Sequence, residues 1–119
     1  FNLSSELTAS LIPKSVTTAI GIEVSVSMGG ISSITVAAII ITGIIGAVAG
    51  PLLCRIFNIK NEIAVGVAMG TAAHAMGTTK ALEMGEIEGA MSSLSIGIAG
   101  IITVFLAPFL VYFSSLLPF

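Results

Sequence analysis

Residues 34–53 read ITVAAIIITGIIGAVAGPLL, and this apolar run decides the fold class. It lies within a stretch from Val24 to Cys54 that contains no charged residue. At about 1.5 Å per residue, a helix of this length crosses a hydrocarbon core of roughly 30 Å. We therefore expect a transmembrane helix over residues 31–54. Its GAVAG segment at residues 46–50 predicts a face on which another helix packs closely.

The whole composition is that of a membrane protein. Hydrophobic residues make up 55% of the 119 residues and charged residues 8%, with a mean hydropathy of +1.14. Soluble domains carry about a quarter charged residues, so a water-soluble globular domain is excluded. A net charge of −2 without a basic tract gives no electrostatic footprint for nucleic acid. One cysteine and one histidine cannot form a structural zinc site, and we expect neither a metal nor another cofactor.

The end of the chain predicts a second membrane span. No residue from Gly89 to Phe119 is charged, and we expect a transmembrane helix over residues 89–114. Between the spans, Arg55 and Lys60 flank a short polar loop. Short loops rich in Lys and Arg stay on the cytoplasmic side. The sequence thus predicts a multi-pass protein of the inner (plasma) membrane, embedded in the lipid bilayer.

Two further segments, residues 7–28 and 63–84, mix apolar residues with glycine, hydroxyl side chains and one lysine each. Such segments suit helices that are broken at membrane depth, which persist only where protein or water lines them. In the second segment we expect the break at residues 77–79. The predicted fold is an all-α polytopic membrane helix bundle with two broken, re-entrant segments, as part of a larger transporter-like fold.

The two halves of the chain share one order of features. In each, a pair of threonines is followed by an acidic residue and then by a long span: Thr17, Thr18 and Glu23, and later Thr78, Thr79 and Glu83. Interrupted segments at corresponding positions of two repeats are typical of transporter binding sites. The sequence leaves open whether the repeats are parallel or inverted.

The first cluster of polar side chains has the sequence PKSVTT and begins at Pro13. Pro13 favours a helix start, where Ser15, Thr17 and Thr18 place hydroxyl groups beside unpaired backbone amides. This arrangement suits an anion, and Lys14 adds a positive charge. A lysine that extends toward the membrane surface from a capped helix end is an equally weighted interpretation.

The second cluster, GTAAHAMGTTK, begins at Gly70. Gly66, Gly70 and His74 share one face of a helix, so we expect His74 to point toward the protein interior. An ionisable group inside a membrane is a functional candidate, although a lone histidine is often a satisfied core residue. Thr78 and Lys80 follow as further candidates for contact with an anion.

Three glutamates, Glu83, Glu86 and Glu88, precede the final span. We favour a solvated boundary of that helix over a site for a coupling ion. No nucleophile elbow, HExxH motif or glycine-rich phosphate loop accompanies these carboxylates. We therefore expect no enzymatic activity.

At these clusters the chain resembles the LrgB/CidB family of membrane proteins, which partner LrgA/CidA. The resemblance rests on PKSVTT at residues 13–18, GTAAHAMGT at 70–78 and EIEGAMSS at 86–93. It implies that this chain is the C-terminal half of a longer protein. Ala19 departs from the family pattern, where proline is frequent, as does Thr79, where alanine is frequent.

The resemblance implies two competing functions: transport of small carboxylates such as pyruvate or glycolate, or holin-like and antiholin-like modulation of murein hydrolase export and autolysis. The broken segments favour transport. A purely structural role, in which the motifs only pack helices, stays open. The expected partners are an LrgA/CidA-like membrane protein, a small organic anion and further copies of the chain. The residues expected to contact substrate are Ser15, Thr17, Thr18, His74, Thr78 and Lys80, with Lys14 as a weaker candidate.

Overall fold

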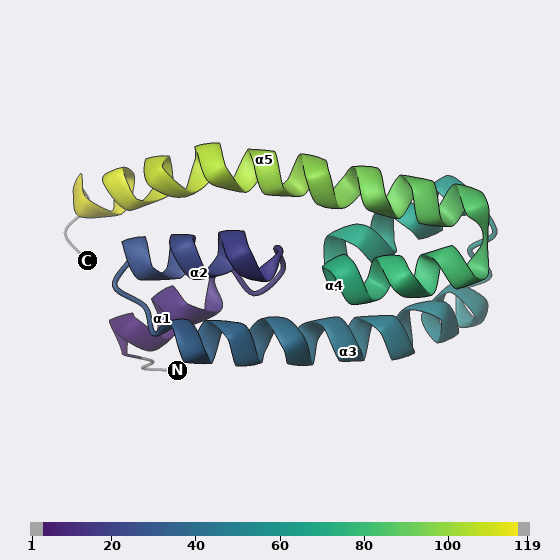
Figure 1. Cartoon of the computed structure of the whole chain (residues 1–119), viewed down its shortest axis with the longest axis horizontal. Helices are drawn as coiled ribbons and strands as arrows, with labels where there is room; N and C mark the ends of the chain where they lie inside the picture. Colours follow the sequence, from purple (N-terminus) through teal and green to yellow (C-terminus); the bar gives the residue numbers. More distant parts are fainter. Residues whose placement is uncertain (1–3, 117–119) are drawn as a thin grey trace.

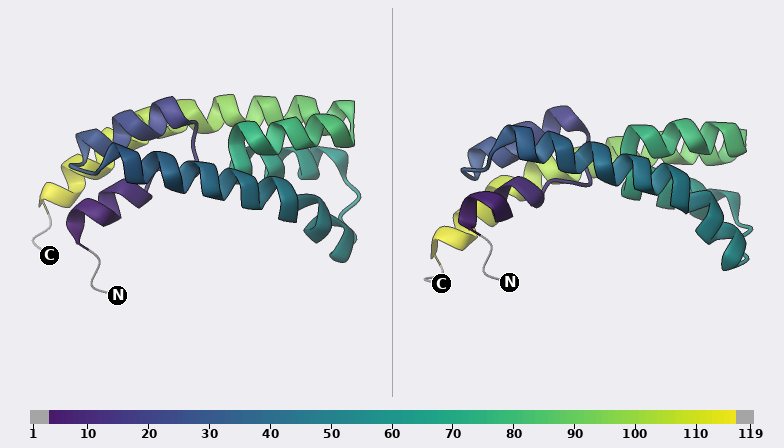
Figure 2. Two further views of the ribbon diagram at one scale, coloured as in Figure 1. Left: turned by 60° about the horizontal axis from the view of Figure 1, so that its bottom comes forward. Right: turned by 90° about the horizontal axis from the view of Figure 1, so that it is seen from below.

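The computed structural model describes residues 4–116, and every regular element in that range is a helix (Figure 1). The helices are α1 (Ser5–Leu11), α2 (Thr18–Ser27), α3 (Ser32–Ile56), α4 (Glu62–Met84) and α5 (Glu86–Leu116). The predicted all-α fold class is confirmed. The long helices α3 and α5 lie along opposite sides of the molecule, with α2 and α4 between them, and α1 packs against α3 and α2 (Figures 1 and 2).

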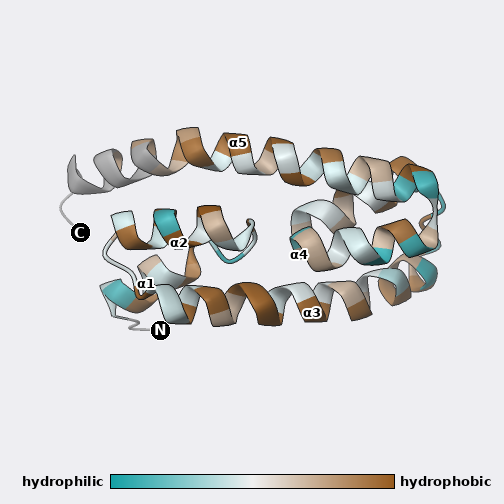
Figure 3. Ribbon diagram, viewed as in Figure 1, coloured by the Kyte–Doolittle hydropathy of each residue, from teal (hydrophilic) through white to brown (hydrophobic). Residues whose placement is uncertain are grey.

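Both long helices are long and apolar enough to cross a membrane. α3 has 25 residues and a length of about 38 Å. The apolar part of α5 extends from Glu86 to Ala107. Isoleucine, leucine and valine side chains are exposed along both helices, whereas the hydrophilic residues of α4 and α5 gather at one end of the molecule (Figure 3). We call this end the charged end, and define it by Arg55, Lys60 and Glu86.

α4 is a helical hairpin that reverses at His74. The backbone angles of His74, φ 40° and ψ −127°, interrupt the helix. In a straight helix Met69 and Gly77 would be about 12 Å apart. In the structure, a side chain on Gly77 would instead collide with the backbone oxygen of Met69. The two arms, residues 62–73 and 75–84, therefore lie side by side.

The expected break at residues 77–79 is thus wrong by a few positions. Gly77 lies inside the second arm and is buried. Its missing side chain allows the arms to approach each other, and the reversal itself takes place at His74. Val65 and Met69 of the first arm and Ala81 of the second form a buried apolar cluster between the arms.

α1 and α2 form a second hairpin, whose loop spans residues 12–17. The hydroxyl group of Ser10 in α1 accepts a hydrogen bond of 2.7 Å from the backbone N–H of Ile31. This bond holds α1 against the start of α3. α2 begins at Thr18 and not at Pro13, because Pro13 lies in a turn in which its carbonyl accepts a hydrogen bond from the Val16 N–H.

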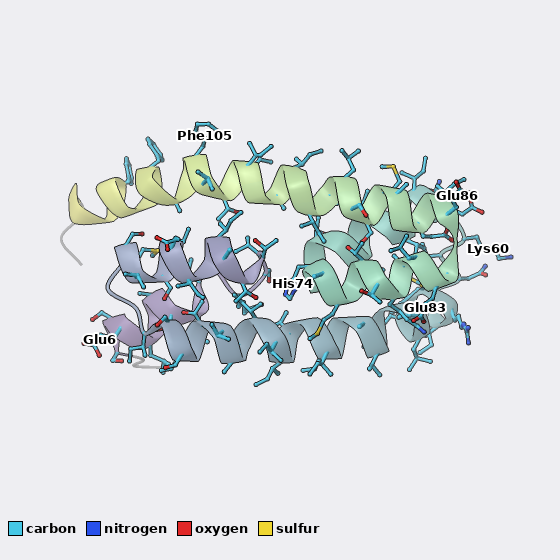
Figure 4. The ribbon with its side chains drawn as sticks, in the orientation of Figure 1. Glu6, Lys60, His74, Glu83, Glu86 and Phe105 are labelled. Carbon is cyan, nitrogen blue, oxygen red and sulfur yellow. The ribbon has the colours of Figure 1, made fainter. Side chains whose placement is uncertain are left out.

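Each hairpin is followed by one long helix, and the two units run in opposite directions (Figures 1 and 2). α3 leads away from the end of the molecule where α1 begins, and α5 leads back to it. The order of hairpin and long helix thus occurs twice, in opposite directions along the molecule. The two hairpin tips, formed by residues 12–17 and by His74, face each other between the long helices (Figures 1 and 4).

Glycines allow the α4 hairpin to approach both long helices closely. Four of them lie in these contacts: Gly46 and Gly50 on α3, facing α4, and Gly66 and Gly70 on α4, facing α5. A side chain on Gly70 would collide with the carbonyl oxygen of Ser92. The GAVAG segment of α3 thus provides a packing face within the chain, as small residues do between membrane helices.

Candidate functional site at the two hairpin tips

His74 stands at the tip of the α4 hairpin and is 5% exposed (Figure 4). Its Nε2 atom is buried and has no hydrogen-bond partner among residues 4–116. A buried polar atom without a partner costs about 1–3 kcal/mol. The positive φ of 40° adds backbone strain, which is retained in proteins chiefly at functional sites. Together these features make His74 the centre of the candidate site.

Three groups surround the His74 ring. The backbone of Gly43, in the middle of α3, lies against it, since a Cβ atom on Gly43 would be 2.9 Å from the His74 Cε1 atom. The Sδ atom of Met76 would be 3.0 Å from the same Cβ position. The backbone carbonyl of Lys14 faces the ring from the first hairpin. The ring therefore lies where both hairpins and α3 meet.

Two helix N-termini point at this meeting place. α2 begins at Thr18, and its N-cap residue Thr17 makes no side-chain capping hydrogen bond. The second arm of α4 begins directly after His74. The first N–H groups of a helix lack partners within it, and a helix N-terminus carries about half a positive charge. Two such ends that face each other favour an anion between them.

The first hairpin brings four of the predicted site residues to its tip. Lys14, Ser15 and Thr17 lie in the loop, and Thr18 is the first residue of α2. The exposed Lys14 Nζ atom donates a hydrogen bond of 3.4 Å to the Ser15 hydroxyl. Ser15 and Thr17 are half-buried. Of the four, Lys14 contacts His74, through its backbone, whereas Ser15 and Thr17 line cavities on the side of α5. We call these four residues and His74 the group at the two tips.

Thr78 and Lys80 lie along the second arm of α4 instead. The Thr78 hydroxyl shares a hydrogen bond of 2.7 Å with the buried hydroxyl of Ser92 in α5. The Lys80 Nζ atom donates to a carboxylate oxygen of Glu83 at 2.7 Å, and the lysine side chain is 42% exposed. Lys80 is about 9 Å along the helix from His74. The structure therefore does not bring these two residues into the group at the tips.

Two open cavities lie along α3 and α4, beginning at the charged end. The outer cavity has a volume of about 730 Å³, and its charged lining residues are Arg55, Lys60, Glu62, Lys80, Glu83 and Glu88. The inner cavity, of about 580 Å³, shares Arg55 and Lys80 with it and continues to Thr79 and Met76. Its polar lining residues lie toward the charged end, and the rest of its lining is apolar, formed by Ala47, Val48, Pro51, Leu52 and Met76, the last of which is a neighbour of His74.

The predicted site residues do not include Gly43, Met76 or Arg55. A signal for Gly43 was present, because Gly43, Gly46 and Gly50 share one face of α3. Met76 gave no such signal, since its approach to Gly43 depends on the reversal of α4.

The fold and the site define a class: all-helical proteins in which a hairpin followed by a long helix occurs twice, in opposite directions, and which have two candidate membrane spans. The chain belongs to the LrgB-like family, whose model matches residues 1–113. The resemblance stated from the motifs is thereby confirmed.

The chain is similar to several curated proteins of this family. It is 46% identical to YwbG of Bacillus subtilis, over 94% of this chain and 50% of the relative. It is 40% identical to the antiholin-like protein LrgB of Bacillus subtilis, over 90% and 46% of the two chains. It is 43% identical to the holin-like protein CidB of Staphylococcus epidermidis, over 93% and 48%. The chain spans about half the length of these relatives. No solved structure matches it.

Proposed function

We propose that this chain is part of a membrane carrier for small carboxylates. The observation that supports this most directly is the buried, unpartnered Nε2 atom of His74 beside two helix N-termini. In transporters, the N-termini of broken helices bind the carboxylate groups of substrates. When the His74 ring is protonated, its Nε2–H group donates to a carboxylate bound at the tips, which is the partner that Nε2 lacks among the described residues. This role involves no catalytic step.

In this proposal the chain is a multi-pass part of the inner membrane. α3 and α5 cross the bilayer, because the large apolar side chains on their outward faces are exposed and not packed within the chain. The two hairpins are then re-entrant segments that enter from opposite sides and end near mid-depth. Their broken backbone is tolerated because neighbouring helices and cavities line it. The whole carrier is a larger transporter-like fold to which this chain contributes one inverted repeat pair.

The predicted residues take different roles in this carrier. Ser15, Thr17 and Thr18 bind the carboxylate together with the first amides of α2, and Lys14 adds positive charge at the tip. Thr78 orients the α4 tip through its bond to Ser92. Lys80 attracts the anion at an earlier stage, in the cavities at the charged end.

The names of the relatives favour a second function. Antiholin-like LrgB and holin-like CidB agree with a role in modulating murein hydrolase export and autolysis. In that role the chain acts with an LrgA/CidA-like partner and with further copies of itself. The exposed apolar faces of α3 and α5 then become contacts between subunits. The group at the tips is in that case a packing feature.

One experiment separates the two functions. The full-length protein that contains this chain is placed in liposomes, with and without an LrgA-like partner. Uptake of labelled pyruvate or glycolate is recorded beside release of an encapsulated dye. Saturable uptake without dye release, reduced about tenfold or more by His74→Gln, supports the carrier; tenfold corresponds to about 1.4 kcal/mol of binding. Dye release without saturable uptake supports the holin-like function and overturns the carrier.

A matched control is Thr71→Val. The Thr71 side chain is exposed and its hydroxyl donates only to carbonyl groups of its own helix. It lies on the same hairpin as His74 but outside the group at the tips. Uptake by this variant is expected to equal that of the wild-type protein.

A further inference from the structure

One flexible side chain, that of Met76, lines the inner cavity and also lies next to His74. Met76 lines this cavity together with Thr79 and Lys80 of the same arm and with Arg55 of α3. His74 is not among the residues that line it. Met76 is 38% exposed, so the side chain has space on the cavity side. Met76 therefore stands between the cavity and the buried ring of His74.

The side chains of Met76 and His74 both pack against the backbone of Gly43. A Cβ atom on Gly43 would lie 3.0 Å from the Met76 Sδ atom and 2.9 Å from the His74 Cε1 atom. Both distances are too short for an ordinary contact between carbon or sulfur atoms. The absence of a side chain at Gly43 is what lets the thioether and the imidazole stand side by side.

The other glycines on this face of α3 have different neighbours. A Cβ atom on Gly46 would collide with the Cβ atom of Ala73, which cannot rotate away. A Cβ atom on Gly50 would meet only the flexible end of Met69. Gly43 is thus the one of the three that contacts the candidate site. Its missing side chain leaves a gap, which we call the notch, and Met76 occupies the notch on the side of the inner cavity.

We propose that Met76 is an access and size filter for the His74 site, and that Gly43 is the notch against which the Met76 side chain closes. The proposal rests on the proposed binding of a small anion at His74. An anion that enters at the charged end passes Arg55 and Lys80 and reaches His74 only when Met76 leaves the notch. A methionine suits this task because its unbranched side chain has three rotatable bonds.

The test uses a readout that does not depend on transport. His74 is the one histidine of this chain, so its modification by diethyl pyrocarbonate is followed in the full-length protein by mass spectrometry of the peptide that contains it. Met76→Ala is expected to raise the modification rate about fivefold, and Met76→Phe to lower it. Met76→Leu conserves the volume and is expected to stay within about twofold of the wild type.

The matched control is Met84→Ala. Met84 lies on the same arm and lines the outer cavity, away from Gly43. Its replacement is expected to leave the modification rate of His74 unchanged. Circular dichroism and a single elution peak establish that each variant is folded. Equal modification rates for the wild type, Met76→Ala and Met76→Phe would overturn the proposal.

A second measurement examines size selection in liposomes. For a series of monocarboxylates with increasing chain length, Met76→Ala is expected to raise kcat/KM for the longest acid relative to the shortest about tenfold. An unchanged ratio would overturn the role as a size filter. If the proposed function is wrong and the Met76 filter exists, a different result is expected. Uptake would then be insensitive to His74→Gln, while the modification rate of His74 would still change in the Met76 variants.

Discussion

The hydroxyl group of Thr35 donates a hydrogen bond of 2.6 Å to the hydroxyl oxygen of Ser25, and both side chains are fully buried. This bond joins α2 to α3. The bond of 2.7 Å between Thr78 and Ser92 likewise joins the second arm of α4 to α5. Each returning hairpin arm is therefore tied by one hydroxyl pair to the long helix that follows it. These pairs contribute to the position of the two tips.

Thr35→Val removes the hydroxyl and keeps the shape of the side chain. It leaves the buried Ser25 hydroxyl without its donor, so the free energy of unfolding is expected to fall by about 1 kcal/mol. Denaturant titration in detergent, followed by circular dichroism, measures this change. Thr71→Val serves as the control and is expected to change stability by less than about 0.5 kcal/mol, because the Thr71 side chain is exposed. An equal effect of both substitutions would contradict the role of the buried pair.

Substitutions of His74 separate backbone strain from binding. Glycine adopts a positive φ without strain, so His74→Gly is expected to be more stable than His74→Ala by about 1 kcal/mol. Both variants lack the imidazole and are expected to lose affinity for the anion. Thermal unfolding in detergent and calorimetric titration with pyruvate measure the two properties. Retained affinity in either variant would exclude the ring from the site, and equal stability would show that the reversal is unstrained.

The close contact of α4 with α5 predicts a sharp difference between two glycines. Gly70→Ala places a Cβ atom against the rigid carbonyl group of Ser92 and is expected to destabilise the fold by about 1–3 kcal/mol. Gly97 on α5 has no heavy atom within 4 Å of its Cβ position. Gly97→Ala is therefore expected to preserve stability or to raise it by up to about 1 kcal/mol. Unfolding curves of the two variants in one detergent provide the comparison.

Lys80 is expected to affect the rate of uptake through its charge. Lys80→Ala should lower uptake about threefold at low salt, and the difference should vanish near 1 M salt, where the Debye length falls to about 3 Å. Glu83→Gln releases Lys80 from its ion pair and should raise uptake at low salt. Initial rates in liposomes over a series of salt concentrations measure both effects. A loss that persists at high salt would place Lys80 in direct contact with the substrate.

The helices of this fold are largely predictable from composition, and the reversal of α4 is not. The uncharged runs before Cys54 and after Gly89 indicate α3 and α5, because only such runs match the length and polarity of a bilayer span. Gly66, Gly70 and His74 follow one helical period without interruption. The reversal at His74 depends on the contact of Gly77 with Met69, which no local pattern contains.

The sequence predicts the part of the candidate site that consists of polar residues around the start of a helix. Lys14, Ser15, Thr17 and Thr18 come to the tip because the loop and the first turn of α2 are consecutive in sequence. Thr78 was expected there too, but its hydroxyl bonds to Ser92, a partner that becomes adjacent only when α5 packs against α4. Long-range packing of this kind decides which polar groups remain available to a ligand.

The reversal of α4 also bears on how the protein enters a membrane. Both ends of α4 lie at the charged end of the molecule, with the C-terminus of α3 and the N-terminus of α5. In the proposed membrane arrangement, the seven charged residues from Arg55 to Glu88 therefore all stay on one side during insertion, and only the uncharged part of the hairpin enters the bilayer. A straight α4 would have to translocate some of them, at about 2.5–3.5 kcal/mol for each charge at the centre of the bilayer. In that arrangement, the hairpin avoids the transfer of charged side chains across the bilayer that a third full span would require.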